Sequence, residues 1–199
     1  ILTLPAPGAT GSLGANKDIV IDTTSPTVTG VSSTNGNGTY GTGAVISITI
    51  GFSTSVNVTG TPQLALNSGG TASYSSGSGT GTLTFSYTVG AGQNSALLDY
   101  TSTAALSLNG GTIKDASNNS ANLTLPAPGA TGSLGANKSI VIDTTSPTVV
   151  SFKVLFGTQS YDVIGSARNR LPWQITGIQV VFSKVIATAD VNSLTGVTT

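Results

Sequence analysis

The chain has 199 residues, of which 38% are hydrophobic, and its seven basic and seven acidic residues give a net charge of zero. No basic surface is therefore expected, which argues against binding to nucleic acid. The chain has no His and no Cys, and every acidic residue is Asp, so Ser-His-Asp catalysis, Cys-His catalysis and His- or thiolate-based zinc sites cannot be assembled. We expect no enzymatic activity and no cofactor, with calcium as the single candidate considered below.

One long sequence occurs twice in the chain. LTLPAPGATGSLGANK, one variable residue and IVIDTTSPTV stand at residues 2–28 and again at residues 123–149. The variable residue is Asp18 in the first copy and Ser139 in the second. A period of about 120 residues is the length of a whole domain, so the duplication indicates modules in tandem.

Each copy ends in TTSPTV, which we interpret as a linker that leads into the first strand of the next module. Pro26 and Pro147 fix their own φ and favour an extended residue before them, which predicts stiff linkers that hold consecutive modules in line. The predicted division has three parts: residues 1–22 as the last strand or strands of one module, residues 23–143 as a complete module, and residues 144–199 as the first part of a divergent module.

Alternation of apolar and polar residues predicts the strands of the complete module. Residues 46–52 place Ile or Phe on one face and Ser, Thr or Gly on the other, and residues 83–89 repeat this pattern. Residues 64–66 and 106–108 give shorter versions with Leu. Clusters rich in Gly and Asn separate these segments, and no stretch shows helical periodicity. The pattern predicts an all-β fold of antiparallel, immunoglobulin-like β-sandwich modules.

The C-terminal segment keeps some landmarks of the complete module. Its Ile178, Val180 and Phe182-Ser183 match Ile48, Ile50 and Phe52-Ser53. Three residues have no counterpart there: Trp173, Arg168 and Arg170. Trp and Arg are enriched where binding energy concentrates, so these three are a candidate interaction patch. The alternative is a core Trp flanked by solvated Arg side chains.

The runs GTYGTGAVISITIGFSTSV, TGTPQLALNSGGTASYSSGSGTGTLTFSYTV and ALSLNGGTIKDASNNSANLTLPAPGATGSLGANKSIVIDTTSPTV resemble the Ig-like repeats of very large bacterial surface proteins. Within that class, the chain is most similar to the repeat family named for cyanobacterial swimming motility. The resemblance implies an extracellular or cell-surface bacterial protein of the adhesin, surface-layer or motility-associated kind, built from repeated sandwiches without enzymatic activity.

The resemblance also bears on calcium, because related modules often bind Ca²⁺ near their junctions through acidic residues. This chain departs from that pattern at Ala44, Thr54 and Leu97, where acidic residues are common. The remaining oxygen donors are Asp115, Asn118 and Asn119 in one turn, with Asp22 or Asp143 at a junction. The alternative is that these residues are ordinary turn formers and linker caps.

Three functions are open at this point. The leading one is a structural and interaction segment of a large secreted or cell-surface protein, in which the modules form an extended stalk or adhesin spacer. Low charge density and few residues that guard sheet edges favour a self-assembling fibre, sheath or surface-layer subunit instead. A carbohydrate-binding module is the third, from five tyrosines that could stack on sugars: Tyr40, Tyr74, Tyr87, Tyr100 and Tyr161.

The expected partners follow from the same composition. We expect neighbouring modules of the same chain to contact one another and identical chains to associate. No nucleic-acid partner is expected. No apolar run approaches the roughly 20 residues that span a bilayer, so no membrane insertion is expected within these residues.

Overall fold

The computed structural model describes residues 3–164 and 175–186 of the chain. The chain divides into two units, Ile1–Thr144 and Thr145–Thr199. The elements of the first unit are α1 (Leu13–Asn16), β1 (Val28–Ser33), β2 (Gly38–Tyr40), β3 (Val45–Thr59), β4 (Gln63–Ala65), β5 (Thr71–Ser76), β6 (Thr80–Thr88), β7 (Leu106–Ser107), β8 (Thr112–Lys114), α2 (Leu134–Asn137) and β9 (Ile140–Ile142). Those described in the second unit are β10 (Val149–Phe156), β11 (Gln159–Asp162) and β12 (Gly177–Phe182).

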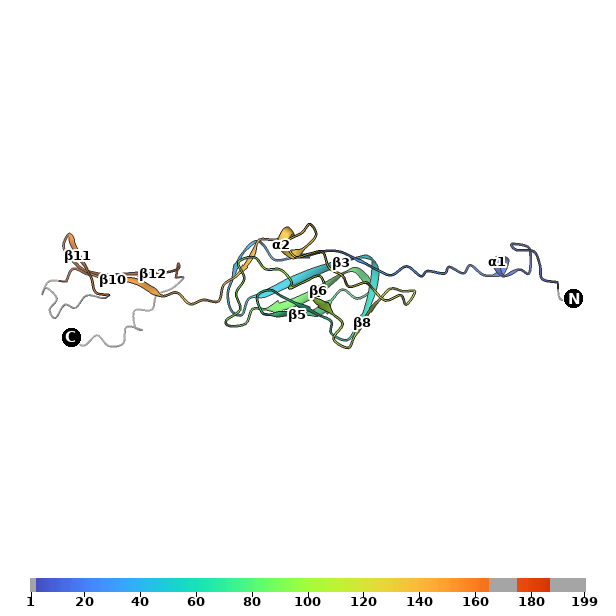
Figure 1. Ribbon diagram of the computed structural model, residues 1–199, viewed down its shortest axis with the longest axis horizontal. Helices are drawn as coiled ribbons and strands as arrows, with labels where there is room; N and C mark the ends of the chain where they lie inside the picture. The colour runs from blue at the N-terminus through green and yellow to red at the C-terminus, as the bar shows by residue number, and fades with distance from the viewer. Residues whose placement is uncertain (1–2, 165–174, 187–199) are drawn as a thin grey trace. The chain divides into compact units, whose positions relative to one another are not determined.

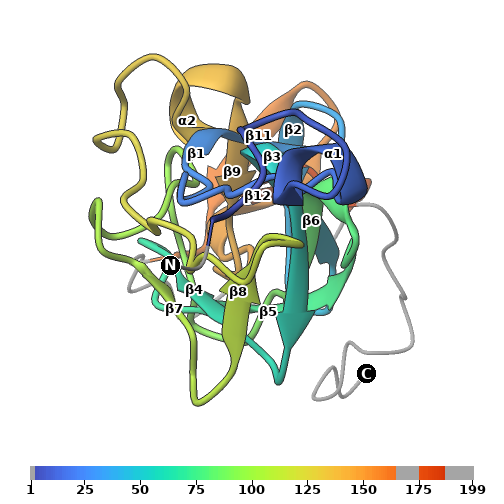
Figure 2. The same cartoon turned by 90° about the vertical axis from the view of Figure 1, so that its right-hand side faces the viewer.

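The main sheet of the first unit runs in the order β1-β3-β6-β5-β4-β7, and β8 pairs with the end of β3. All of these pairs are antiparallel. A smaller layer consists of β2 and β9, which pair in parallel, and is extended by an antiparallel bridge between Ser95 and Ile142. Figures 1 and 2 show α2 and β9 on the side of this unit opposite β5.

These layers confirm the prediction of a mainly β, sandwich-like fold built on antiparallel sheets. The parallel pair β2–β9 is a difference from the wholly antiparallel sandwich that we expected. The connection from β2 to β9 comprises residues 41–139, which is far longer than the dozen or so residues that a parallel pairing needs.

The apolar faces of β3 and β6 form the centre of the core, as their alternation predicts. Ile48 lies opposite Phe85 and Ile50 lies opposite Leu83 in the register of the two strands, and all four side chains are fully buried. Cross-strand apolar pairs of this kind are the unit of stabilisation in a sheet. The intervening Ser and Thr residues of β3 are half-buried, because their face of the sheet is only partly covered.

Leu108 departs from the predicted alternation at residues 106–108. The strand β7 ends at Ser107, and Leu108 exposes 36% of its surface. The chain turns immediately afterwards through Asn109 and Gly110, which have φ of 46° and 79°. This left-handed geometry, favourable for Asn and Gly, ends the strand before Leu108 can pack.

Two single-turn helices, α1 and α2, were not expected from the sequence. Each begins after a serine whose side chain accepts a hydrogen bond from the backbone N–H three residues later: Ser12 from Ala15 at 3.3 Å, and Ser133 from Ala136 at 3.1 Å. These are N-caps. Four residues are too few for apolar periodicity to be detected, so only the capping serine marks these turns in the sequence.

The second unit begins with the same strand pairing as the first. Thr27 N–H donates to Ser53 Oγ at 3.0 Å, and Ser53 N–H donates back to the Thr27 carbonyl at 2.9 Å. Thr148 and Ser183 make the same two bonds at 2.9 and 2.8 Å. The next pair is Val28 with Phe52 in one unit and Val149 with Phe182 in the other, and a register shift follows in both. The matching Phe-Ser pairs therefore hold equivalent places.

Candidate functional site

The second copy of the repeated sequence completes the core of the first unit. We call residues 124–143 the closing segment and residues 3–22 the N-terminal copy. Four apolar residues of the closing segment are buried in the core: Leu125, Leu134, Ile140 and Ile142. The helix α2 lies in contact with β1. Burying four large aliphatic side chains contributes on the order of 6–12 kcal/mol to folding before entropy is counted.

Hydrogen bonds hold the first half of the closing segment. Leu125 N–H donates to the Thr103 carbonyl at 2.9 Å, and Gly129 N–H donates to Asp99 Oδ2 at 3.0 Å. Val31 contributes two further contacts, because its N–H donates to the Gly132 carbonyl at 2.8 Å and its carbonyl accepts from Asn137 Nδ2 at 2.8 Å. These bonds pair Leu125 N–H, Gly129 N–H and the Gly132 carbonyl of this irregular stretch with groups of the rest of the unit.

The second half is held as a strand between two neighbours. On one side β9 pairs with β2. On the other, Leu98 N–H donates to the Ile140 carbonyl at 2.7 Å, and Ser95 and Ile142 exchange two bonds of 2.8 Å. Lys138 Nζ donates to the Asn35 carbonyl at 3.1 Å, just before the strand begins. The closing segment thus lies in a slot whose backbone groups and apolar surface both require an occupant.

Asp99 and Tyr100 contact the closing segment inside this slot, and both side chains are buried. Tyr100 Oη donates to the Pro126 carbonyl at 2.6 Å. Gly135 packs against Asp99 so closely that a Cβ at Gly135 would lie 2.8 Å from Asp99 Oδ2. Burial, and secondarily the charge of Asp99, raises the pKa of Tyr100 to about 12, so the phenol remains a donor in alkaline solution in which an ordinary tyrosine ionises.

The N-terminal copy has the same sequence but exposes its apolar residues. Leu4, Leu13 and Ile21 are 85%, 70% and 84% exposed, whereas their counterparts in the closing segment are buried. Ile19–Asp22 is not a strand in this copy, although the equivalent residues include β9. The same sequence is therefore exposed in residues 3–22 and buried in residues 124–143 of this structure.

The N-terminal copy nevertheless has the local conformation of the closing segment. Gly8 and Gly11 have φ of 81° and 89°, against 78° and 90° at Gly129 and Gly132. The capped turns α1 and α2 also agree, with φ and ψ of −74° and 160° at Ser12 and of −76° and 163° at its counterpart. This conformation is encoded locally, because it forms without the contacts of the core.

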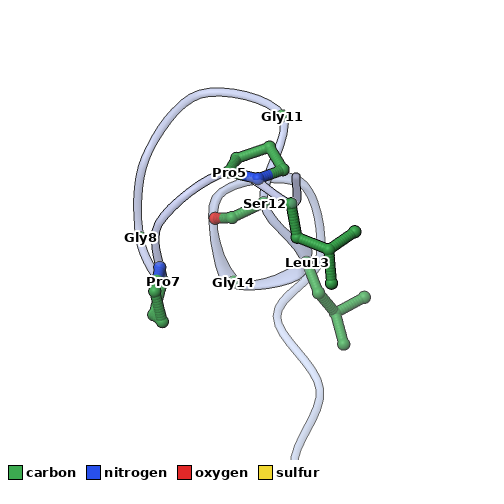
Figure 3. Close-up of a pocket in the computed structure, with 8 residues that line it drawn as sticks. Pro5, Pro7, Gly8, Gly11, Ser12, Leu13 and Gly14 are labelled. Carbon is green, nitrogen blue, oxygen red and sulfur yellow. The ribbon is translucent and has the colours of Figure 1, made fainter. Parts of the chain in front are cut away.

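The turns of the N-terminal copy surround an open hollow of about 370 Å³, shown in Figure 3. Its lining includes Pro5, Gly8 and Gly14. The counterparts of these residues in the closing segment, Pro126, Gly129 and Gly135, are the ones that contact Asp99 and Tyr100. The hollow therefore has the same kinds of lining residue as the surface of the closing segment that faces Asp99 and Tyr100.

The candidate calcium donors fall into two groups. Asp115, Asn118 and Asn119 share one turn, as predicted, and Asp22 joins them because its carbonyl accepts from Asn119 Nδ2 at 3.1 Å and its Oδ2 accepts from Ser117 Oγ at 3.4 Å. Both oxygens of Asp115 already accept from Asn119, at 2.8 Å from the backbone and 2.9 Å from the side chain.

The bonding of this turn lowers the pKa of Asp115. Desolvation acts in the opposite direction, but the hydrogen bonds from the side chain and backbone of Asn119 and from the backbone of Ser117 outweigh it. Asn118 has a φ of 69° and accepts from Lys114 Nζ at 3.1 Å. These are the properties of an Asx-type turn.

Asp143 is not part of this group. Its N–H donates to the Tyr40 carbonyl at 3.0 Å, beside β2. Across residues 3–164 and 175–186 the structure contains no cluster of three or more Asp, Glu, His or Cys side chains that could hold a metal ion. The same residues contain no helix that is long and apolar enough to cross a membrane.

The other sequence-based candidates are placed as follows. Trp173, Arg168 and Arg170 lie outside the described residues. Tyr87 and Tyr100, which were considered for sugar stacking, are core residues with 1% exposure and present no ring face to solvent.

The sequence analysis did not identify Asp99, and it considered Tyr100 only for sugar stacking, although both residues anchor the closing segment. A single Asp-Tyr pair after a short apolar stretch carries no motif, and its role depends on a contact with residues about 30 positions further along the chain. A signal did exist in the duplicated segment, whose fixed Pro and Gly spacing indicates a shaped surface with a partner.

No family model, no curated protein and no solved structure matches this chain.

Proposed function

We propose that the chain is a non-catalytic structural segment, in which Ig-like sandwich modules follow one another in series and act as a stalk or spacer of a bacterial surface protein. This proposal rests most on one observation, which is that the first strand pair of each unit begins in the same way. Thr27 pairs with Ser53 in the first unit and Thr148 pairs with Ser183 in the second, and a register shift follows in both. A recurring start, together with a recurring closing sequence, is what a serial array requires.

The path of the chain through the first unit supports a role in spacing. The chain enters beside Ser53 and Asn122, where Thr27 pairs. It leaves beside Tyr40 and Asn94, which bond Asp143 and Thr144. In Figure 1 the blue chain that leads into the sheets of this unit reaches them at one end, and the orange chain that follows them leaves at the other end. Each module in such a series adds its own length, because entry and exit do not lie at the same end.

The resemblance to bacterial Ig-like surface repeats supports an extracellular location. The composition agrees with it, since solubility rests on Ser, Thr and Asn rather than on charge and stability does not depend on Cys.

Labelling of intact cells tests the location. Antibodies raised against the chain should decorate the surface of the producing bacterium, and brief treatment of intact cells with protease should remove the label. Labelling that appears only after lysis would contradict a surface role.

A further inference from the structure

We propose that the first unit bears tension, and that residues 31–40 and 132–143 form the clamp that resists it. The first range lies near the start of the unit and the second range at its end, so a force on the chain reaches both directly. The inference deepens the proposed function and rests on it for its biological role, because a stalk is pulled along its length by whatever its tip holds.

The first half of the clamp is held by three hydrogen bonds between the two ranges. Val31 N–H donates to the Gly132 carbonyl at 2.8 Å, and the Val31 carbonyl accepts from Asn137 Nδ2 at 2.8 Å. Lys138 Nζ donates to the Asn35 carbonyl at 3.1 Å. The partners advance along both ranges in the same direction.

The second half of the clamp continues in this direction as a parallel strand pair. Ser139 begins it, because its N–H donates to Asn37 Oδ1 at 3.0 Å and its carbonyl accepts from Gly38 N–H at 3.0 Å. The parallel ladder of β2 and β9 follows. Asp143 ends it with a bond from its N–H to the Tyr40 carbonyl at 3.0 Å. The two ranges are thus bonded in parallel from one end to the other.

The parallel direction determines how a force acts on these bonds. In a parallel pair, the N-terminal end of one segment and the C-terminal end of the other lie at opposite ends of the pair. Tension reaches the first range from Thr27 and the second range from Thr144, so the ranges are pulled in opposite directions along their own axes. The bonds between them are loaded together, whereas an antiparallel pair held at the same termini would open one bond at a time.

Further contacts keep the clamp from peeling away. β1 pairs with β3 on its other side. Beside β9, Ser95 and Ile142 exchange two bonds of 2.8 Å, and Leu98 N–H donates to the Ile140 carbonyl at 2.7 Å. Ile140 and Ile142 are also buried in the core. Strands β4, β5 and β7 form no part of the direct path between the two loaded ends, which makes their neighbourhood suitable for control variants.

The sequence allows the unit to be loaded at two chosen points of the full chain. The chain has no Cys, so Asp18→Cys and Ser146→Cys, at exposed positions on either side of the sheets of the first unit, supply unique attachment sites for force spectroscopy. Forced unfolding is governed by the unfolding rate. We expect a single step whose length corresponds to residues 27–143. An earlier, shorter step that frees the closing segment alone would overturn the proposal.

A matched pair of variants tests the clamp itself. Asn37→Ala removes the side-chain acceptor of Ser139 N–H within the clamp. Ser78→Ala is the control, because it removes the side-chain acceptor of Val58 N–H at 2.9 Å, at an equally exposed position outside the path of the load. Both should cost similar stability in urea. At constant force Asn37→Ala should unfold about fivefold faster than wild type, and Ser78→Ala should stay within about twofold.

A second clamp variant shows whether the bonds break together. Asn137→Ala removes the bond to the Val31 carbonyl, in the other half of the clamp. If the bonds share one transition state, Asn37→Ala combined with Asn137→Ala should accelerate unfolding by about the product of the two single effects. A double variant no faster than the faster single variant would overturn the proposal, and so would equal rates for Asn37→Ala and Ser78→Ala. Either result leaves the surface location standing, and absence of surface labelling leaves the clamp standing.

Discussion

Tyr100 Oη donates a 2.6 Å hydrogen bond to the carbonyl oxygen of Pro126, and this contact fastens the closing segment to the buried side of the first unit. Tyr100→Phe keeps the ring but leaves the carbonyl without its donor. We expect a loss of about 1–2 kcal/mol in the free energy of unfolding, measured by urea denaturation. Tyr40→Phe is the control, since its hydroxyl bonds the exposed Gly36 carbonyl, and it should cost less. Equal losses would contradict the anchoring role.

The raised pKa of Tyr100 predicts a loss of stability in alkaline solution. The folded-state pKa is about 12 and the reference value is 10.0. The stabilisation by the protonated phenol is complete below pH 10 and is lost as the pH rises through 12, because the unfolded chain releases this proton first. The difference in free energy of unfolding between wild type and Tyr100→Phe should therefore shrink between pH 10 and 12. A difference in free energy of unfolding that stays constant over this pH range would show that ionisation of the Tyr100 phenol does not affect stability.

The lowered pKa of Asp115 predicts the opposite dependence in acid. Its ionised form accepts from Asn119 in the folded state only, so the stabilisation is present above the unfolded pKa and is lost as the pH falls through the folded pKa. Asp115→Asn should be less stable than wild type at neutral pH, and the two should converge in acid. Thermal melts at a series of pH values measure this. A gap that does not narrow would contradict the assignment.

The core could be predicted from the sequence, and the closing segment could not. Ile48 and Phe85 follow a period of two that any half-buried strand imposes. The closing segment alternates only over its last few residues, because most of it is a chain of turns that packs through Leu134 and through backbone contacts. The duplication marked this segment as a module end, but only the structure shows which residues receive it.

Gly14 and Gly135 provide a second matched pair of substitutions. Alanine favours a helical turn over glycine by about 1 kcal/mol, so Gly14→Ala, where a Cβ meets no atom within 4 Å, should be neutral or slightly stabilising. At Gly135 the same Cβ would lie 2.8 Å from Asp99 Oδ2. Gly135→Ala should therefore destabilise by about 1–3 kcal/mol, measured by urea denaturation. A neutral Gly135→Ala would mean that Asp99 can move away at no cost.

The turn at Asp115 illustrates a different limit of sequence reasoning. The sequence analysis predicted that Asp115, Asn118 and Asn119 share one turn, and it left open whether they bind a metal ion or only form the turn. The structure adds that Asn119 already occupies both carboxylate oxygens of Asp115. Such pairing depends on side-chain rotamers, which a spacing pattern does not specify.

The central claim is that the same sequence stabilises the core in residues 124–143 and is exposed, without a role in stability, in residues 3–22. Leu134 is fully buried and Leu13 is 70% exposed, so the direct measurement is the free energy of unfolding of Leu134→Ala and Leu13→Ala under the same conditions. We predict a loss of about 2–5 kcal/mol for Leu134→Ala and a change within about 0.5 kcal/mol for Leu13→Ala. Similar losses in both variants, or none in either, would contradict the claim.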